Sequence, residues 1–160
     1  MLCQGLRLRS VKPFLRAATA EDLSGVLALL RAASLPEDIE PHFHTFVVAE
    51  ADEQVIGAVG LELLGRNALL RSLLVVPGWR KAGVGTLLTK RAIRVACTHS
   101  VERLFLLTTD AAPFFERFGF LHAVRDEAPT EIKSTREFSE LCPASAWFMW
   151  LSLAMRSVDS

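Results

Sequence analysis

Apolar residues recur at helical spacing near the start of the chain. Residues 20–33 carry a leucine-rich set three and four positions apart, as on one helix face: Leu23, Val26, Leu27 and Leu30. The acidic pair Glu21-Asp22 suits the positive end of such a helix. We therefore predict an amphipathic helix over 20–33, preceded by a short strand at 12–17.

Three β-rich runs follow, at residues 45–50, 55–64 and 68–76. The polar residues 51–54 separate the first two runs, and Gly65-Arg66-Asn67 separates the last two. Short polar breaks between β-rich runs are typical of hairpins. The pattern predicts an antiparallel meander of three consecutive strands.

The second half of the chain alternates helices with strands. Gly83-Val84-Gly85 opens a helix whose apolar positions are again three and four apart. The later elements are predicted as a strand at 102–109, a short helix at 112–118 closed by Gly119, a strand at 120–124, a helix at 130–141 with Thr130 as N-cap, and a strand at 147–153. A meander followed by this alternation predicts a mixed α/β sheet of about six to seven strands flanked by helices.

Length and composition fit one domain. With 51% hydrophobic and 22% charged residues, the 160-residue chain is neither a disordered segment nor a coiled coil. No repeat or linker divides it, so we expect one domain over 12–155, with residues 1–11 outside the fold. The 18 basic and 18 acidic residues cancel. This balance gives no electrostatic reason to expect a nucleic acid or a membrane as partner.

The three cysteines are Cys3, Cys97 and Cys142. Their odd number and long spacing argue against a disulfide framework or a structural zinc site and fit a reducing cytoplasm. The N-terminus lacks the apolar core and cleavage site of a secretory signal. A lone Cys142 does not supply the several thiolates of a soft arsenite site. We therefore expect a cytoplasmic protein without a bound metal.

The most informative segment is LLVVPGWRKAGVGT, residues 73–86, in which an apolar strand enters a turn that opens a helix. This geometry directs unpaired backbone N–H groups and the positive helix end at one spot. Gly83 and Gly85 let a phosphate approach the backbone, and Arg80 and Lys81 add cationic donors. The segment matches neither GxGxxG nor GxxxxGK[ST]. It predicts either a pyrophosphate site or a plain turn with surface cations.

Two strings resemble the signatures of a known superfamily. Val75-x-Pro77-x-x-Arg80-x-x-Gly83-x-Gly85 resembles the coenzyme A signature of the GNAT superfamily of N-acyltransferases. Residues 111–120, AAPFFERFGF, resemble its second signature, a short helix that ends in Gly-Phe. The resemblance covers roughly residues 12–153. It implies a GNAT-like sheet that is splayed at its centre, with acetyl-CoA as co-substrate.

A narrower resemblance concerns two further strings. Residues 68–73, ALLRSL, and 134–146, STREFSELCPASA, are similar to the arsenic-resistance N-acetyltransferases, the ArsN group. That group acetylates the amino groups of amino-acid-like toxins related to arsinothricin and phosphinothricin. The resemblance thus implies a small-molecule amine as acceptor and a role in arsenic resistance. A homodimer is the default expectation for the assembly.

The superfamily resemblance also implies where acetyl-CoA binds. The strands at about 69–76 and 104–109 would splay apart, and pantetheine would lie between them. Backbone groups of Leu74, Val75 and Val76 would pair with it, and an N–H near Leu74 would polarise the thioester carbonyl. The amides that would hold the pyrophosphate are those of Lys81, Ala82, Gly83, Val84, Gly85 and Thr86.

Direct transfer requires a neutral amine and a way to remove its proton. Glu62 is the candidate side-chain base, because burial in an apolar strand would raise its pKa. Alternatively Glu62 faces solvent, or pairs with Arg71 across the hairpin, while water takes the proton. A four-residue loop would place Glu62 opposite Arg71, whereas a three-residue loop would place Leu61 there.

The chain departs from the superfamily pattern at two positions. Many members carry a tyrosine in the second signature as acid for the leaving thiolate, but this chain has no tyrosine and has Phe115 at the matching position. Water, or the hydroxyl of Thr108 or Thr109, would then protonate the thiolate. Asp110 stands where related enzymes often have asparagine. These departures also permit a non-catalytic acyl-CoA-binding module.

Candidate acceptor-binding residues are two arginines and three polar neighbours. Arg71, inside ALLRSLLVV, needs an anionic partner or a cleft, and its planar fork matches a carboxylate, phosphinate or arsinate. Arg136 is the second candidate clamp. Each arginine has a structural alternative, an ion pair for Arg71 and solvation for Arg136. Ser72, Thr109 and the loop residue His44 complete the set. An ordinary amino acid or a peptide terminus is the alternative acceptor.

Overall fold

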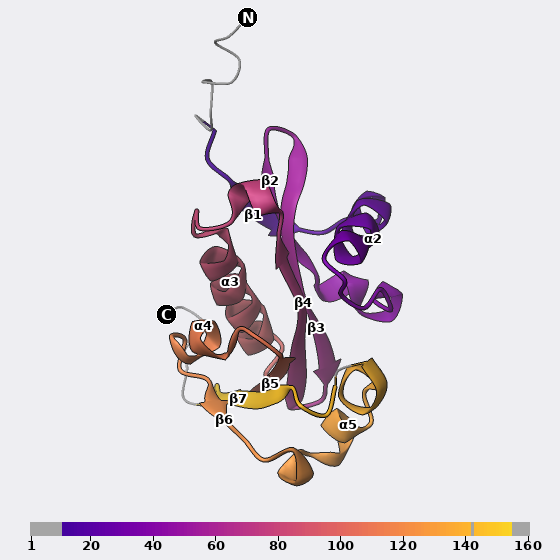
Figure 1. Ribbon diagram of the computed structural model, residues 1–160, viewed down its shortest axis with the longest axis vertical. Coiled ribbons are helices and arrows are strands. Elements are labelled where there is room, and N and C mark those ends of the chain that lie inside the picture. Colours follow the sequence, from indigo (N-terminus) through magenta and orange to yellow (C-terminus); the bar gives the residue numbers. More distant parts are fainter. Residues whose placement is uncertain (1–10, 142, 155–160) are drawn as a thin grey trace, which may run out of the picture.

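The computed structural model describes residues 11–141 and 143–154, in which seven strands form one sheet (Figure 1). The strands are β1 (Phe14–Ala17), β2 (Val47–Ala51), β3 (Gln54–Leu64), β4 (Asn67–Val75), β5 (Arg103–Thr108), β6 (Leu121–His122) and β7 (Trp147–Ser152). Their spatial order is β1-β2-β3-β4-β5-β7-β6. The β4–β5 pair is parallel, whereas the other neighbouring pairs of this sheet are antiparallel. The predicted mixed sheet is confirmed. The expectations for residues 1–10, and for Cys3 and Cys142, lie outside the described residues.

The predicted meander is confirmed as β2, β3 and β4, but the last turn is shorter than expected. The loop between β3 and β4 consists of Gly65 and Arg66 alone. Gly65 has a φ of 71°, which suits a two-residue hairpin turn. Glu62 consequently lies opposite Leu69, and Arg71 lies opposite Gly60. Both predicted registers, which assumed longer loops, were wrong.

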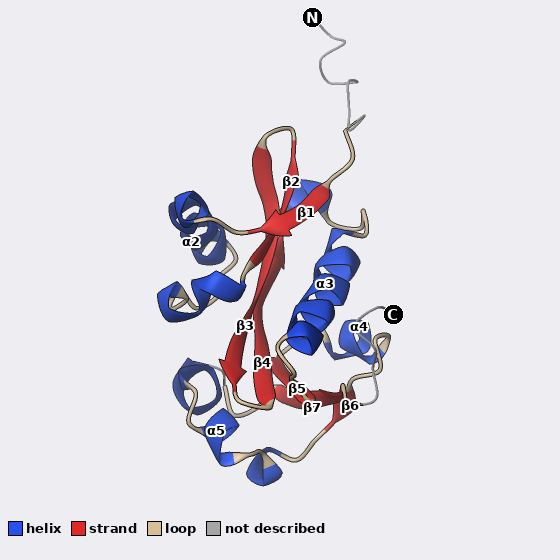
Figure 2. Ribbon diagram, turned by 180° about the vertical axis from the view of Figure 1, so that it is seen from behind, coloured by secondary structure: helices blue, strands red, loops and turns tan. Residues whose placement is uncertain are grey.

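Helices cover both faces of the sheet (Figure 2). One face carries α3 (Val84–Thr98) and α4 (Ala112–Glu116), and the other carries α2 (Leu23–Ala32) and α5 (Thr130–Lys133). Shorter helical turns are η1 (Ala20–Asp22), η2 (Glu40–Thr45), η3 (Pro77–Trp79), η4 (Arg125–Glu127) and the π-helical η5 (Glu137–Leu141). Within residues 11–141 and 143–154, none of the helices has the length and apolar character that a bilayer span requires.

The helix predicted over 130–141 is interrupted. α5 ends at Lys133, and a π-helical turn resumes at Glu137. The N-cap position of α5 is Pro129, so the prediction of Thr130 was wrong by one residue. The Ser134 and Thr135 hydroxyls donate to the carbonyl oxygens of Thr130 and Ile132, and such bonds from serine and threonine bend helices.

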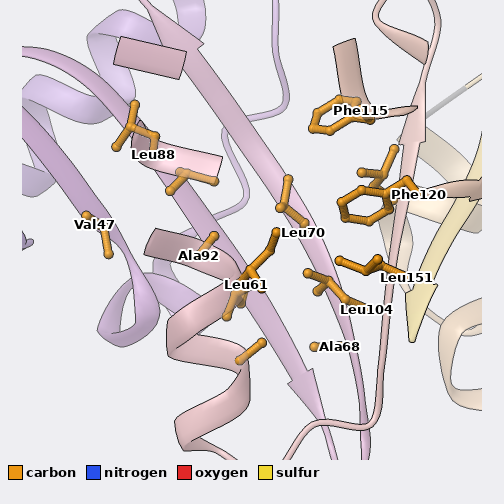
Figure 3. Close-up of a cluster of buried hydrophobic side chains, with 14 of the residues drawn as sticks. Val47, Leu61, Ala68, Leu70, Leu88, Ala92, Leu104, Phe115, Phe120 and Leu151 are labelled. Atoms are coloured by element: carbon orange, nitrogen blue, oxygen red, sulfur yellow. The ribbon is translucent and has the colours of Figure 1, made fainter. Parts of the chain in front are cut away.

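The larger hydrophobic core lies between α3 and the sheet (Figure 3). Leu88 and Ala92 of α3 pack there with Leu61 and Leu70 of the meander. Leu69 points to the opposite face and joins a smaller cluster beside α5. Burying a leucine contributes roughly 1.5–3 kcal/mol. Because both faces of β4 are covered, this strand is firmly held where the functional site begins.

Candidate functional site

The central parallel strands separate part-way along their length. β4 pairs with β5 only where Asn67, Ala68 and Leu69 face the first three residues of β5. Beyond Leu69, β4 remains paired with β3, and β5 remains paired with β7 as far as Thr108. The facing edges of the two strands therefore diverge. The splay predicted at the sheet centre is confirmed.

A β-bulge lies on β4 shortly after the point where the strands diverge. Arg71 pairs with Gly60 and Leu74 pairs with Ala58, so Ser72 and Leu73 share one opposing residue. Ser72 has a φ of 61°, which is unusual for a residue with a side chain. Bulges leave backbone groups unpaired and redirect side chains beside active sites. The bulge thus turns this part of β4 toward the gap.

A cavity of about 300 Å³ occupies the gap, and we call it the gap cavity. Its walls are β4, β5 with the turn that follows it, the segment after α2, and the η5 region. The residues that line it are Ser34, Leu35, Pro36, Leu70, Arg71, Ser72, Leu73, Leu106, Leu107, Thr108, Thr109, Asp110, Ala111, Phe115, Glu137, Leu141 and Pro143. The cavity therefore brings together four of the predicted site residues, Arg71, Ser72, Thr109 and Phe115, and the candidate acid Thr108.

A second cavity of about 420 Å³, the cradle cavity, lies at the start of α3. It is lined by Val75, Trp79, Arg80, Lys81, Gly83, Gly85, Thr86, Phe114 and Arg117. Three of these side chains are cationic, which favours an anionic ligand. The predicted cluster of glycines and cations is thus gathered around one hollow.

The backbone of the turn is shaped for close approach. Gly83, at the N-cap of α3, has a φ of 85°, and Lys81 has a φ of 69°. The first N–H groups of a helix lack partners within the helix and carry its positive end. A Cβ at Gly85 would lie 3.6 Å from Cζ of Phe114 and 3.8 Å from Cγ2 of Val75, between two walls of the cradle cavity.

A buried charge cluster lies behind the gap cavity. The Arg71 guanidinium, in a residue only 2% exposed, donates to Glu62 through Nη1 and to Asp38 through Nη2, the latter at 2.7 Å. Its Nε donates to the Ser72 hydroxyl at 3.2 Å. Oε1 of Glu137 lies 3.4 Å from Nη2. Three carboxyl groups therefore surround one guanidinium.

Glu137 differs from the other carboxyl groups of this cluster. It is 6% exposed and lines the gap cavity. Burial raises the pKa of Glu137 to about 7, and the negative charges of Glu62 and Asp38 add to this, while Arg71 acts in the opposite direction. Near neutral pH this carboxyl group is therefore poised between its two protonation states.

Residues 42–121, half of the chain, match the family model described as an acetyltransferase (GNAT) domain. The chain belongs to the GNAT family. It is 33% identical over 97 residues to an uncharacterized N-acetyltransferase of Chlorobaculum tepidum, covering 60% of this chain and 62% of that protein. It is 29% identical over 126 residues to the amino-acid acetyltransferase of Aeromonas salmonicida, covering 72% of this chain and 28% of that protein. The chain thus spans less than two thirds of either relative.

The fold of this GNAT domain also recurs in a solved structure. N-acetylglutamate synthase from Neisseria gonorrhoeae, complexed with coenzyme A and N-acetyl-glutamate, superposes with a TM-score of 0.77 at 22% identity. The match covers 91% of this chain and 36% of that chain. At this identity the likeness concerns the fold.

Several predicted residues of the GNAT domain lie outside both cavities. Glu62 is buried against Arg71, with the His42 ring nitrogen Nε2 3.6 Å from Oε1, so the predicted alternative of an ion pair is realised. Arg136 is 61% exposed, donates to Glu140, and lies 3.7 Å from Asp38. His44 is exposed on η2. None of these three side chains is among the residues that line the gap or cradle cavity.

Leu74 and Val76 line a small cavity of about 90 Å³ between α2 and the end of β4. Val84 is buried in the core, and Ala82 lies in the turn before it. These residues were predicted to contact the coenzyme through their backbone groups. The positions of their side chains do not test those contacts, which stay a prediction.

Sequence analysis missed Glu137, Asp38 and Arg117. Glu137 and Asp38 reach Arg71 from segments 66 and 33 positions away, and the sequence carried no local signal for such contacts. Arg117 lies in the second signature, three residues after Phe114. Residues three apart lie on the same face of a helix, so the sequence could have indicated that Arg117 lines the cradle cavity together with Phe114.

Proposed function

We propose that this GNAT domain transfers the acetyl group of acetyl-CoA to the amino group of a small amino-acid-like acceptor. The observation that carries the proposal is that nearby residues of β4 line the two cavities. Residues 70–73 line the gap cavity, and Val75 lines the cradle cavity. The adjacent Phe114 and Phe115 line one cavity each. The two cavities together thus suit a ligand whose anionic end lies in the cradle cavity and whose reactive end lies in the gap cavity.

The residues of the cradle fit the coenzyme. Arg80, Lys81 and Arg117 supply positive charge, and Gly85 leaves open the space that a Cβ would fill. Backbone amides from Lys81 to Thr86 would hold the pyrophosphate. Acetyl-CoA supplies the thioester that an amine attacks. Backbone groups of residues 74–76 would align it, next to the bulge at Ser72.

The walls of the gap cavity support a small acceptor. Glu137, Leu141 and Pro143 border it on one side, and residues 34–36 border it on another. A volume of about 300 Å³ is at the lower end of ligand pockets. The name of one relative, the amino-acid acetyltransferase, gives an amino acid as its acceptor, and an amino acid is a molecule of this size. A peptide terminus would require an open groove instead.

Within this class we propose a glutamate-mimicking toxin of the arsinothricin and phosphinothricin kind, in arsenic resistance. Support comes from the resemblance of residues 134–146 to the ArsN group and from two nearby arginines. The Arg71 guanidinium already pairs with carboxylates of the protein. The acidic group of an acceptor would therefore have to replace Asp38 or Glu137 as its partner. Arg136, whose side chain is exposed 3.7 Å from Asp38, is the second cation.

Thiolate protonation falls to groups other than tyrosine. Phe115 lines the gap cavity and packs edge-on against Phe114 and Phe120. The Thr108 hydroxyl, which accepts a hydrogen bond from the Ala111 N–H, and the Thr109 hydroxyl line the same cavity. Water or one of these hydroxyls would supply the proton.

Release of free thiol from acetyl-CoA tests the proposal. The acceptor panel comprises arsinothricin, phosphinothricin, glutamate, the other common amino acids and a short peptide. We expect thiol release to depend on a free amino acid, with the toxins preferred over glutamate. Release with the peptide alone would overturn the acceptor class. Tight coenzyme binding without release for any amine would instead indicate a non-catalytic acyl-CoA-binding module.

A further inference from the structure

Glu137 is the buried acidic side chain that faces the gap cavity. It lies on the π-helical turn η5, and π-helical turns occur frequently at functional sites. Glu62 and Asp38 each accept a hydrogen bond from Arg71. Among the described residues no donor gives a hydrogen bond to Glu137, and its contact is the 3.4 Å ion pair with Arg71. Its carboxylate lone pairs are therefore available to a ligand in the cavity.

We propose that Glu137 accepts the proton of the acceptor's ammonium group in the gap cavity. This role rests on the proposed function and deepens it. The other acidic residue of the cavity wall, Asp110, is exposed, so water solvates its carboxylate. Glu62, the base predicted from the sequence, does not line the cavity.

The surrounding charges favour an ammonium group at this place. Facing Glu137 are Arg71 of β4, Glu62 of β3 and Asp38 of the segment after α2. Behind them, the His42 ring lies 3.6 Å from Glu62 and Arg136 lies 3.7 Å from Asp38. Three carboxyl groups thus share one buried guanidinium, and this excess of acidic groups attracts a cation.

The protonation equilibrium of Glu137 suits the task. Burial raises its pKa to about 7, which brings the carboxylate closer in basicity to an amine than an ordinary glutamate is. An ammonium group that enters beside it replaces water and adds a positive charge. Both partners of the proton transfer then lie side by side in the gap cavity.

The ammonium group gives one proton to the Glu137 carboxylate and becomes a neutral amine. Its lone pair attacks the thioester carbon, so that a C–N bond forms, the C–S bond breaks, and sulfur leaves with the electron pair. The second N–H proton passes to the thiolate through water. Glu137 then returns its proton to solvent, and the products are one amide, one thiol and one proton.

The test compares Glu137→Gln and Glu137→Asp with wild type, using Glu127→Gln as the matched control. Glu127 is an exposed glutamate on η4 that lines neither cavity. Initial rates of thiol release are measured from pH 5.5 to 10 with the preferred amino acid, and with propylamine at high concentration. Circular dichroism and thermal melting show that each variant is folded.

We expect kcat/KM of wild type for the acceptor to fall below about pH 7. Glu137→Gln lowers kcat about 100-fold at pH 7, abolishes that acidic limb, and recovers activity at high pH, where free amine is abundant. The KM for acetyl-CoA stays within about 2-fold, Glu137→Asp retains the limb at a lower rate, and Glu127→Gln behaves as wild type.

Two outcomes separate this role from the proposed function. Activity with propylamine but with no amino acid would overturn the acceptor class, and the profile of Glu137→Gln with propylamine would still decide the role of Glu137. Equal pH profiles for wild type and folded Glu137→Gln would overturn the role of Glu137 and leave the acceptor class standing. No thiol release with either kind of amine would overturn both.

Discussion

Nη2 of Arg71 lies 2.7 Å from Oδ1 of Asp38, and this contact fastens the segment after α2 to the middle of β4. The same guanidinium holds Glu62 of β3 and approaches Glu137 of η5. One side chain therefore joins four segments that are distant in sequence. Three of them, β4, Asp38's segment and η5, border or adjoin the gap cavity, so the shape of this cavity depends on Arg71.

The first prediction concerns Arg71→Met. Removing one partner from a buried ion pair leaves uncompensated charge, so the variant should lose about 3–5 kcal/mol of unfolding free energy. The matched control is Arg66→Met, because Arg66 pairs with Glu102 at 3.1 Å on the surface, with 79% and 49% of the two side chains exposed. That variant should change by less than about 1 kcal/mol.

Urea denaturation at pH 7 measures both changes. Adding Glu62→Gln and Glu137→Gln to Arg71→Met should restore part of the loss, because fewer buried carboxylates are then left without a counter-ion. A loss for Arg71→Met no larger than that for Arg66→Met would contradict the structural role of the cluster.

The second prediction concerns the pH dependence of stability. The pKa of Glu137 is raised from 4.5 to about 7 in the folded protein. Below pH 4.5 the carboxyl group is protonated in both the folded and the unfolded state, so its stabilising contribution is fully present. Between pH 4.5 and 7 the unfolded state releases the proton first, and stability falls by up to about 3 kcal/mol.

Glu137→Gln cannot ionise and lacks this decrease. The unfolding free energy of the variant relative to wild type should therefore rise from pH 5 to pH 8. Urea denaturation at several pH values measures the difference in unfolding free energy between the two proteins. The prediction concerns how this difference changes with pH and not its value at one pH. Parallel curves for the two proteins across this range would show that Glu137 ionises normally in the folded state.

Local sequence sufficed where the functional geometry is itself local. The cradle consists of the end of β4, one turn and the first residues of α3, so the order of apolar, glycine and basic residues in 73–86 predicted it. The family followed from the same string. The meander was predictable for a similar reason, because each of its strands pairs with its neighbour in the chain.

The gap cavity depended on contacts that no local pattern reports. Glu137 and Asp38 meet Arg71 only because β4, η5 and the segment after α2 converge in space. The bulge at Ser72 contains no glycine that would have indicated it in the sequence, and it shifts the register between Ala58 and Gly60. The two-residue turn places Glu62 opposite Leu69, so Glu62 reaches Arg71 diagonally, although neither predicted loop length was correct.

The third prediction concerns Phe115→Tyr. Phe115 lines the gap cavity, so a hydroxyl there would supply the acid that the chain lacks at this position. If thiolate protonation limits turnover, kcat should rise several-fold while the acceptor KM stays nearly constant. Steady-state rates of thiol release measure both constants. The control is Phe114→Tyr, whose ring lines the cradle cavity instead. An unchanged kcat in a folded Phe115→Tyr would show that water or a threonine hydroxyl already protonates the thiolate rapidly.

The fourth prediction concerns the cradle and compares two glycine-to-alanine changes. A Cβ at Gly85 makes ordinary contacts of 3.6 Å and 3.8 Å with Phe114 and Val75, so the free protein should tolerate it. It would nevertheless fill space where, on our proposal, the pyrophosphate approaches the backbone, so the KM for acetyl-CoA should rise about 10-fold, equivalent to about 1.4 kcal/mol.

Gly25→Ala on α2 is the matched control. A Cβ there meets nothing within 4 Å, and alanine favours a helix over glycine by up to about 1 kcal/mol. Its melting temperature should stay level or rise, and its KM for acetyl-CoA should equal that of wild type. Calorimetric titration with coenzyme A measures the same contrast without any acceptor. Equal coenzyme affinities for Gly85→Ala and Gly25→Ala would mean that the diphosphate binds away from the start of α3.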